Sequence, residues 1–385
     1  MNTNPRLCKK SRRLPLLVAT AAFVILSVQA SAQKLITIDV PDAGTLAGQG
    51  TFATTVNPEG AVTGYYIDSN NTYHAFLRTK QGIISTFNPP GTGTGSYEGS
   101  MGWGINPAGA IAGVFWGPNC LYHGYVRTPD GNFETFDAPG AGTGPSTCTL
   151  TAVPIYQGTI PGNMNPKGEI AGTMLDKNYV YHGFVRTADG KFETIDPPDA
   201  GTEPFQGTWV SFAAGLTDGG TVTGWYIDGT NITHGYVRTK DGEISTFDGP
   251  GEGVLVTMAF STNSRGETVG FYVDADYLLH GFLRTKEGKI TTTDVPFTGN
   301  GAGQGTQPEA NNNAGVITGN YIDANYANHG YVLAADGRIT AFDPLSAGPG
   351  AGQGTIPIYI NQTGAITGSF MDTVGVSHGF LRMPR

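Results

Sequence analysis

Short apolar segments of four to eight residues, separated by polar and glycine-rich stretches, run along most of the chain. In the segment 304–343, such runs lie at 316–322, 330–333 and 338–342, and Gly, Asn or Asp bounds each one. β-Branched and aromatic residues dominate the runs, which is typical of strands joined by tight turns. Asn-Pro-x-Gly and Asp-Gly turns supply the positive φ angles that these connections require. The pattern predicts four strands in every segment of about 50 residues.

The same unit recurs seven times, and one histidine marks each copy. Gly follows each histidine, or Ala75 in the first copy, and Phe or Tyr comes next. The chain has 7 His, and every one belongs to this motif. They are His74, His123, His182, His234, His280, His329 and His378. Self-similarity at this period indicates a repeat architecture.

Seven units of four antiparallel strands favour an all-β fold, namely a seven-bladed β-propeller of four-stranded antiparallel blades. The segment 33–39 matches the fourth strand of a unit, such as 243–248, whereas the last unit stops after its third strand at 378–382. We therefore expect the N-terminal strand to join the last blade and close the ring. Closure would remove the open sheet edges that a linear stack would leave.

Residues 1–32 have the pattern of a secretory signal peptide. Five basic residues lead into an apolar stretch at 14–28, and Ala30-Ser31-Ala32 forms a small-x-small cleavage site. A retained membrane anchor is the alternative, but a membrane-spanning helix needs roughly 20 apolar residues. Ser11-Arg12-Arg13 leaves the twin-arginine export route open. We expect a secreted protein, extracellular or periplasmic, with a single propeller domain at 33–385 and no membrane partner after cleavage.

Composition narrows the class of protein. The 385 residues include 58 Gly and 24 Pro but only 14% charged residues, which excludes helical bundles and coiled coils. A hydrophobic content of 39% supplies a core and excludes simple disorder. Without residues 1–32, 17 basic and 31 acidic residues remain, a net charge of −14. Such a surface repels polyanions, so we expect no nucleic-acid partner and a monomeric protein.

The repeat unit resembles an extracellular repeat family named for its His-Ala-Phe motif. The motif is present literally as His74-Ala75-Phe76 and as His-Gly-Phe or His-Gly-Tyr in the other copies. The resemblance covers 34–382. It implies an exported, bacterial repeat protein, and it brings no established catalytic residues that could be carried over to this chain.

An aspartate stands six positions before six of the seven histidines, and Gly117 replaces it before His123. A carboxylate and an imidazole together can bind a metal or perform acid–base catalysis. A feature built into nearly every unit also fits an architectural role, in which the pair satisfies buried loop amides. We favour the structural role. The aspartates are Asp68, Asp176, Asp228, Asp274, Asp323 and Asp372.

Four of these loops open with Asp-x-Asp or Asp-x-Asn, which are groups that calcium prefers. Calcium takes six to eight oxygen ligands, however, and the glycine and closing glutamate of a calcium loop are missing. Asx turns account for the same residues. We expect no cofactor, keep calcium as the alternative, and assign no metal ligands.

The repeated arginines, such as Arg127 and Arg186, follow the histidine motif in six of the seven units. We assign them a structural role as well. Asp137 and Asp196, which end fourth strands, are their expected ion-pair partners.

A Gln-Gly-Thr motif precedes the first strand of most units. In one interpretation, these side chains gather at one mouth of the propeller channel and hydrogen-bond a sugar. In the other, each is a turn residue that bonds its own loop. The candidate ligand-binding residues of this set are Gln49, Glu98, Gln157, Gln206, Glu252, Gln304 and Gln353.

The second unit departs most from the others. It contains Trp103 and Trp116, which are candidates for stacking on sugar rings, with core packing as the alternative. It also contains Cys120, and Cys148 follows in the next long loop. We predict a disulfide between these two cysteines, which would pin a loop of about 28 residues.

The sequence contains no nucleophile elbow, P-loop, HExxH motif or dinucleotide fingerprint. We expect a non-catalytic binding or structural module whose ligand is an extracellular glycan or protein. The alternative is a propeller enzyme, a lyase or hydrolase of a polysaccharide or cyclic ester, that uses a repeat histidine with a metal. One exposed Asp-His pair beside non-repeated acids would favour the enzyme, whereas seven equivalent buried histidines would favour the binding module.

Overall fold

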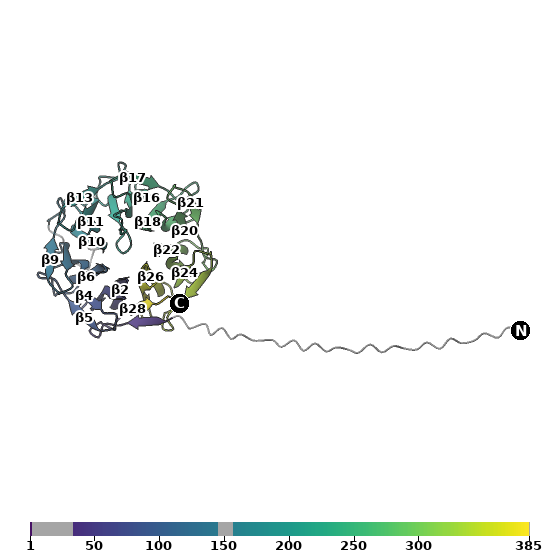
Figure 1. Ribbon diagram of the computed structural model, residues 1–385, viewed down its shortest axis with the longest axis horizontal. Coiled ribbons are helices and arrows are strands. Elements are labelled where there is room, and N and C mark those ends of the chain that lie inside the picture. Colours follow the sequence, from purple (N-terminus) through teal and green to yellow (C-terminus); the bar gives the residue numbers. More distant parts are fainter. Residues whose placement is uncertain (2–33, 145–156, 385) are drawn as a thin grey trace. The chain divides into compact units, whose positions relative to one another are not determined.

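The computed structural model describes residue 1 and residues 34–144 and 157–384. Within these residues all regular structure is β-structure, and its 28 strands belong to one continuous sheet. Figure 1 shows the strands arranged in a ring, so the expectation of an all-β, propeller-like repeat fold is confirmed. Apart from Met1, the predicted signal peptide lies outside the described residues. The described part of the chain contains no helix with the length and apolar character needed to cross a bilayer.

The strands fall into four classes, and Figure 1 labels members of the inner class, such as β6 and β22, toward the centre of the ring and members of the outer class, such as β9 and β17, at its rim. The inner strands are β2 (Gly50–Val56), β6 (Gly99–Ile105), β10 (Gly158–Met164), β14 (Gly207–Val210), β18 (Val256–Thr262), β22 (Gly305–Asn311) and β26 (Gly354–Ile360). The second strands are β3 (Val62–Ile67), β7 (Ile111–Trp116), β11 (Ile170–Leu175), β15 (Val222–Ile227), β19 (Thr268–Val273), β23 (Ile317–Ile322) and β27 (Ile366–Met371). The third strands are β4 (Tyr73–Arg78), β8 (His123–Arg127), β12 (Tyr181–Arg186), β16 (Thr233–Arg238), β20 (Leu279–Arg284), β24 (Asn328–Leu333) and β28 (Ser377–Arg382). The outer strands are β5 (Ile84–Phe87), β9 (Phe133–Phe136), β13 (Phe192–Ile195), β17 (Ile244–Phe247), β21 (Ile290–Thr292), β25 (Ile339–Phe342) and β1 (Leu35–Ile38).

The pairing follows this order of classes. Inner, second, third and outer strands pair antiparallel in turn, as β2, β3, β4 and β5 do. A one-residue parallel bridge then connects a third strand to the next inner strand, for example Tyr73 with Gly99. β1 pairs antiparallel with β28 over four residues, from Leu35 opposite Arg382 to Ile38 opposite Gly379. The N-terminal strand therefore completes the sheet beside the last strand of the chain, as the sequence predicts.

The core lies between neighbouring strand groups. The third strands contribute fully buried aromatic rings, with Phe76, Tyr125, Phe184, Tyr236, Phe282, Tyr331 and Phe380 at most 1% exposed. A glycine of the second strand makes room for each ring. A Cβ atom on Gly64 would lie 2.8 Å from the Phe76 ring and 2.0 Å from the Phe52 carbonyl oxygen. Any larger residue there would displace the ring or the backbone.

The connections form two faces. The loop face consists of the loops from second to third strands, such as 68–72, and those from outer to inner strands, such as 88–98, which are joined by the hydrogen bond from Tyr97 N–H to the Asn71 carbonyl. The turn face consists of the turns from inner to second strands, such as 57–61, and from third to outer strands, such as 79–83. All candidate histidines and glutamines lie toward the loop face.

Candidate functional site

The seven motif histidines occupy nearly equivalent settings. In each, Nδ1 lies 2.7–3.1 Å from an aspartate, or from Asn88 in the first unit, just beyond the paired outer strand. In six, Nε2 faces the loop aspartate at 3.2–3.9 Å. Their side chains are all between 20% and 30% exposed. No single histidine is set apart by exposure.

An aromatic ring of the second strand forms the floor of most of these settings. Tyr272 stacks on His280 with 5.0 Å between ring centroids, and Tyr66 stacks on His74 at 4.9 Å. Each histidine therefore connects a loop, an outer strand and a second strand. Two neighbouring units lack one of the two aspartates that face the histidine. Asn88 replaces the outer acid in the first unit, and Gly117 replaces the loop acid in the second.

The loop aspartates form Asx turns. Asp274 Oδ1 accepts the backbone N–H of Asp276 and of Leu278, both at 2.9 Å, while its Oδ2 lies 3.2 Å from His280 Nε2. Burial opposes the charged form of Asp274, but the amide donors and His280 outweigh it and lower its pKa. The same two amide contacts recur at the other five loop aspartates.

The paired carboxylates act on the histidines in the opposite direction. The hydrogen bond that the Asp196 carboxylate accepts from His182 raises the pKa of His182, against the effect of burial. Burial lowers the pKa of His280, but the hydrogen bonds with Asp294 and Asp274 outweigh burial and raise it overall. These pKa shifts are expected for an imidazole that is paired with carboxylates. The paired carboxylates hold the imidazole between two loops. Nowhere in 34–144 or 157–384 do three or more His, Cys, Asp or Glu side chains converge as a metal site would require.

The arginines pair with different acids from those we predicted. Arg186 pairs with Glu134, and Arg238 pairs with Glu193, each on the outer strand of the preceding unit. The expected pairing with Asp137 and Asp196 is wrong, because the motif histidines already engage these two carboxylates. The guanidinium groups also lie 4.6–4.8 Å above phenylalanine rings of the preceding outer strand, in the pairs Arg127–Phe87, Arg186–Phe136, Arg284–Phe247 and Arg382–Phe342. The arginines thus join neighbouring units.

The Gln-Gly-Thr motif anchors five of the seven inner strands, and Glu98-Gly99-Ser100 takes its place at β6. The glycine is needed for close approach, because a Cβ on Gly99 would lie 2.0 Å from the Tyr73 carbonyl oxygen, at a φ of 141°. The threonine is buried, and Thr51 Oγ1 accepts the Val40 N–H at 3.0 Å. Gln49 is 2% exposed, accepts the Leu46 N–H at 3.1 Å and donates to Asn71 Oδ1 at 3.0 Å.

The remaining glutamines are used in the same way. Gln157, Gln206, Gln304 and Gln353 each accept a backbone N–H of the loop that carries them. Glu98 accepts the Gly95 N–H at 2.8 Å. Glu252 is exposed and is not their counterpart, because the residue that precedes the bridging position of β18 is Leu255. The structure therefore favours the turn interpretation over a ring of sugar-binding amides.

The two candidate tryptophans lie in different places. Trp116 is 2% exposed and donates from Nε1 to the Tyr97 carbonyl at 2.6 Å, so it belongs to the core. Trp103 lies half-buried on β6, and Phe212 stacks on it with 5.2 Å between centroids. One face of the Trp103 ring is thereby covered.

Trp103 belongs to a larger aromatic cluster that sequence reasoning missed. Phe212 comes from the unit of His234 and Trp103 from the unit of His123, so the contact passes across the unit between them. That unit has Gly162 at this position, where a Cβ would lie 2.8 Å from the Phe212 carbonyl oxygen. Ring contacts of 4.8–6.2 Å connect Phe52, Tyr65, Trp103, Phe212, Trp209, Trp225 and Phe260. The cluster therefore connects inner strands of units that are not neighbours in the sequence.

A non-repeated acid, Glu309, lies on the inner strand β22. It is the unpaired residue of a β-bulge between Pro308 and Ala310, and it is half-buried. Desolvation raises the pKa of Glu309 to about 8. Within the described residues its carboxyl group has no hydrogen-bond or ion-pair partner. The sequence signal for it was a single acidic residue at a position where the other units carry Thr, Trp, Gly, Ser, Phe or Ile.

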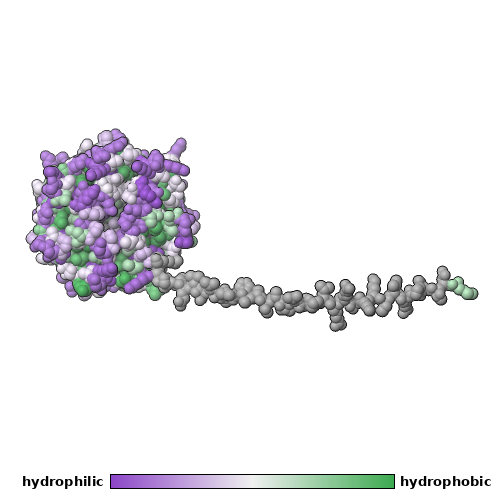
Figure 2. Space-filling view, in the orientation of Figure 1, coloured by the Kyte–Doolittle hydropathy of each residue, from purple (hydrophilic) through white to green (hydrophobic). Residues whose placement is uncertain are grey.

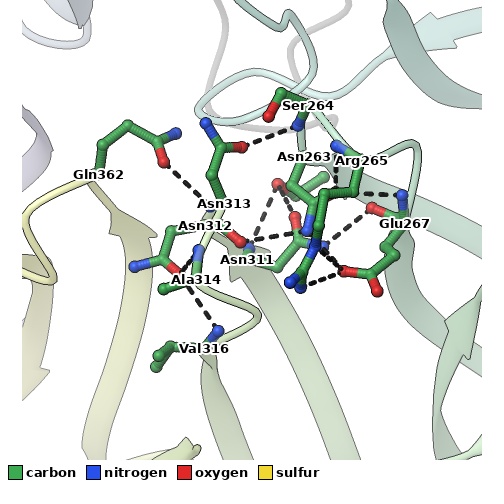
Figure 3. Close-up of polar contacts among 11 residues, drawn as sticks. Asn263, Ser264, Arg265, Glu267, Asn311, Asn312, Asn313, Ala314, Val316 and Gln362 are labelled. Atoms are coloured by element: carbon green, nitrogen blue, oxygen red, sulfur yellow. Dashed lines mark hydrogen bonds and ion pairs between the residues drawn. The ribbon is translucent and has the colours of Figure 1, made fainter. Parts of the chain in front are cut away.

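The turn face is held by an asparagine belt, formed by Asn57, Asn106, Asn165, Asn263, Asn312 and Asn361. Each Oδ1 caps its own turn; for example, Asn312 accepts the N–H groups of Ala314 and Val316 at 3.1 Å (Figure 3). The Nδ2 groups donate to the backbone carbonyl of the next unit, Asn312 to Asn361 at 3.3 Å and Asn361 to Asn57 at 3.0 Å. The belt therefore connects the last unit directly to the first.

A cavity of about 90 Å³ opens inside the asparagine belt. Belt residues, Tyr359 and the segment that contains Ala214, Leu216 and Thr217 line it. Ala214 packs in one cluster with Ala310 and Ile360. The inward turn of this segment thus narrows the channel at the turn face.

Cys120 is fully buried in the loop after β7. Cys148 lies outside the described residues, so the disulfide stays a prediction. The masses of alkylated protein with and without prior reduction would test it, and equal masses would refute it.

No family model matches the sequence, and no curated protein matches it. Among solved structures, the chain is similar to the BP39L lectin from Burkholderia pseudomallei, with 10% identity, a TM-score of 0.46 and coverage of 86% of this chain and 98% of the lectin. It is also similar to TolB from Acinetobacter baumannii, with 11% identity, a TM-score of 0.45 and coverage of 84% of this chain. A third similar structure is the S511A mutant of puromycin hydrolase in complex with PGG, with 12% identity, a TM-score of 0.46 and coverage of 87% of this chain. This chain spans 64% of TolB and 52% of the hydrolase.

Proposed function

We propose that this protein is a secreted seven-bladed β-propeller of the His-Ala-Phe repeat type that acts as a non-catalytic binding module for an extracellular glycan or protein. Seven blades of four strands, with β1 completing the last one, account for the order of strand classes and for the pairing of β1 with β28. Export follows from the segment 1–32. N-terminal sequencing of the exported protein, expected to begin at Gln33, tests the cleavage.

The equivalence of the seven histidines carries the proposal of a binding module. All seven are 20–30% exposed and bonded to an outer-strand partner in the same way. A catalytic pair would differ from its copies, whereas anchors repeat. The arrangement gives a rigid ring whose loops are free to vary.

A glycan array, read with and without EDTA, tests the proposed function. We expect binding of a restricted set of glycans that EDTA leaves unchanged. An array of secreted and cell-surface proteins provides the second arm. Absence of any specific partner on both arrays would contradict a binding module.

Glu309 favours a second candidate, a propeller lyase or hydrolase acting on a polysaccharide or cyclic ester. A carboxyl group whose pKa is raised to about 8 holds its proton near neutral pH and can act as a general acid. Turnover that is abolished by Glu309→Gln but not by Glu59→Gln would establish this candidate in place of the binding module.

A further inference from the structure

The loop face carries aromatic residues at backbone positions that favour glycine. Five have φ between 61° and 69°, namely Tyr97, Tyr179, Phe205, Tyr277 and Tyr326. A positive φ is uncommon for any residue except glycine, and for a bulky side chain it is a conformational outlier. All five belong to the loops from second to third strands or from outer to inner strands.

These residues occur in a recurring pair of left-handed positions. The N–H of the second position donates to the carbonyl of the first at 2.7–2.9 Å, in the pairs Asn71–Tyr97, Tyr179–Phe205, Tyr277–Gly303, Tyr326–Gly352 and Gly375–Gly48. In the last pair both residues are glycine, with φ of 88° and 84°. The backbone arrangement therefore forms without any side chain, and an aromatic ring at either position is additional to what the fold requires.

Three of the five rings remain exposed in the folded protein, so burial does not offset the cost of their backbone conformation, whereas Tyr97 and Tyr179 are half-buried. Tyr277 is 62% exposed, Tyr326 46% and Phe205 43%. The side chain of Tyr277 has no ring or hydrogen-bond partner among the described residues, and the hydroxyl of Tyr326 makes one hydrogen bond of 3.3 Å to the Ala302 carbonyl. A strained and exposed ring that contributes little to the core points to a role outside the fold.

We propose that Phe205, Tyr277 and Tyr326, the exposed left-handed aromatic residues, are stacking platforms for the sugar rings of a neutral polysaccharide, an inference that rests on the proposed binding function. The platforms are separate, since each belongs to a different pair of loops, and the half-buried Tyr179 lies beside Phe205 with 5.9 Å between ring centroids. Figure 2 likewise shows hydrophobic residues on one face of the molecule as small patches among hydrophilic ones. Separate flat rings suit the alternating sugar units of a chain better than one continuous apolar protein surface.

The residues around the platforms and the net charge of the protein indicate the chemical class of the glycan. Exposed Asp276, Asn325 and Glu203 each lie within two residues of a platform and offer acceptors for sugar hydroxyl groups. The protein without residues 1–32 carries a net charge of −14, which opposes binding of uronate or sulfated polymers. The ligand is therefore a neutral glycan.

Affinity electrophoresis in gels that contain galactomannan, xyloglucan or alginate tests the proposal. We expect the protein to be retarded by at least one neutral polymer and not by alginate. The double variant Tyr277→Gly/Tyr326→Gly should bind the neutral polymer at least about tenfold more weakly, because each stacked ring buries apolar area. Its melting temperature should be unchanged or higher, because glycine relieves the backbone. The control Ile83→Gly removes an exposed apolar side chain from the turn face and should leave binding unchanged.

Each other outcome has a distinct meaning. Full binding by the double variant would overturn the platforms and leave the proposed function intact. Retardation by alginate equal to that by the neutral polymers would overturn the neutral class. No retardation of the unmodified protein would overturn the glycan ligand and leave only the protein arm of the proposed function. A lower melting temperature of the double variant would assign the rings to the fold.

Discussion

The turn face and the loop face of this ring both need side chains that fix their connections, but the two faces use different side chains for this purpose. At the turn face, six of the seven inner-to-second turns use one buried asparagine, whose Oδ1 caps the turn and whose Nδ2 in five of them is seen to reach the next unit. At the loop face, a complete Asp-His-Asp set anchors the loops of five of the seven units, and aromatic residues are added in strained positions that differ among units. The difference indicates that the turn face serves the fold, whereas the loop face serves the fold and a ligand together.

The largest expected effect comes from breaking the asparagine belt. Asn361→Ala should lower the free energy of unfolding by roughly 2–4 kcal/mol, because it removes the acceptor for the Thr363 and Ala365 N–H groups and the donor to Asn57. Denaturant unfolding measures this effect. The control Glu59→Ala changes an exposed side chain of the turn that begins at Asn57 and should change stability by less than about 0.5 kcal/mol. Equal losses in the two variants would show that the belt is not what joins the last unit to the first.

Between the two faces, Glu309 should give the next largest effect. Its pKa is raised to about 8, so the folded state binds its proton more tightly than the unfolded state, in which the value is 4.5. Its contribution to stability is full below pH 4.5 and is lost as the pH rises from there through 8. Glu309→Gln removes this loss and should gain roughly 2 kcal/mol relative to the unmodified protein between pH 5 and pH 9, after allowance for channel water.

The pH profile separates this effect from any change in packing. Chemical denaturation at pH 5, 7 and 9 gives the difference in unfolding free energy between the two proteins at each pH. A pH-independent cost of the buried amide is the same at every pH, so it cancels when these differences are compared. Glu59→Gln, an exposed acid on the turn face, should follow the profile of the unmodified protein. An unchanged profile in Glu309→Gln would show that Glu309 is well solvated.

The anchors of the loop face should contribute less than the asparagine belt does. Asp274→Ala removes two amide contacts and the charge beside His280, and should cost about 1–2 kcal/mol in thermal or denaturant unfolding. Asp274→Asn retains the amide contacts and should cost at most about 1 kcal/mol. If the two variants lose the same free energy of unfolding, the ion pair between Asp274 and His280 rather than the Asx turn stabilises this loop.

Repetition explains why so much of the fold was readable from the sequence. The strands, their order and the pairing of 34–38 with the last strand follow from seven aligned copies, because each copy repeats the same local pattern. The Asx turns and the buried Gln-Gly-Thr motifs were also among the alternatives that local chemistry offered.

Features that depend on contacts between units, or that occur in one unit alone, were not predicted from the sequence. The contact of Trp103 with Phe212 depends on an inward turn in one unit and on a glycine in the unit between, and neither is meaningful without the curvature of the ring. Glu309 lies at a β-bulge that recurs in β2, β6, β18 and β26, and it differs from the residues at those bulges by its carboxyl group, which the repeat pattern does not predict. The arginines were assigned to the wrong acids because their partners lie in the preceding unit rather than in their own.

Glycine substitutions at two exposed residues, one on each face, should change stability only slightly and in opposite directions. Tyr277, on the loop face, and Ile83, on the turn face, are 62% and 67% exposed, but only Tyr277 has a positive φ, of 62°. Tyr277→Gly should therefore stabilise the protein by about 0.5 kcal/mol, because glycine adopts this conformation without a Cβ clash. Ile83→Gly should destabilise it by about 0.5–1 kcal/mol, because glycine there only adds freedom to the unfolded chain.

Both changes are measured as shifts of the denaturant midpoint at constant slope. Loss of stability in Tyr277→Gly would mean that the ring has contacts which hold the loop, and the strain would then belong to the fold. A gain in stability would mean that this fold carries Tyr277 at a cost, which selection for folding alone would have removed by substituting glycine, as the pair Gly375 and Gly48 already has.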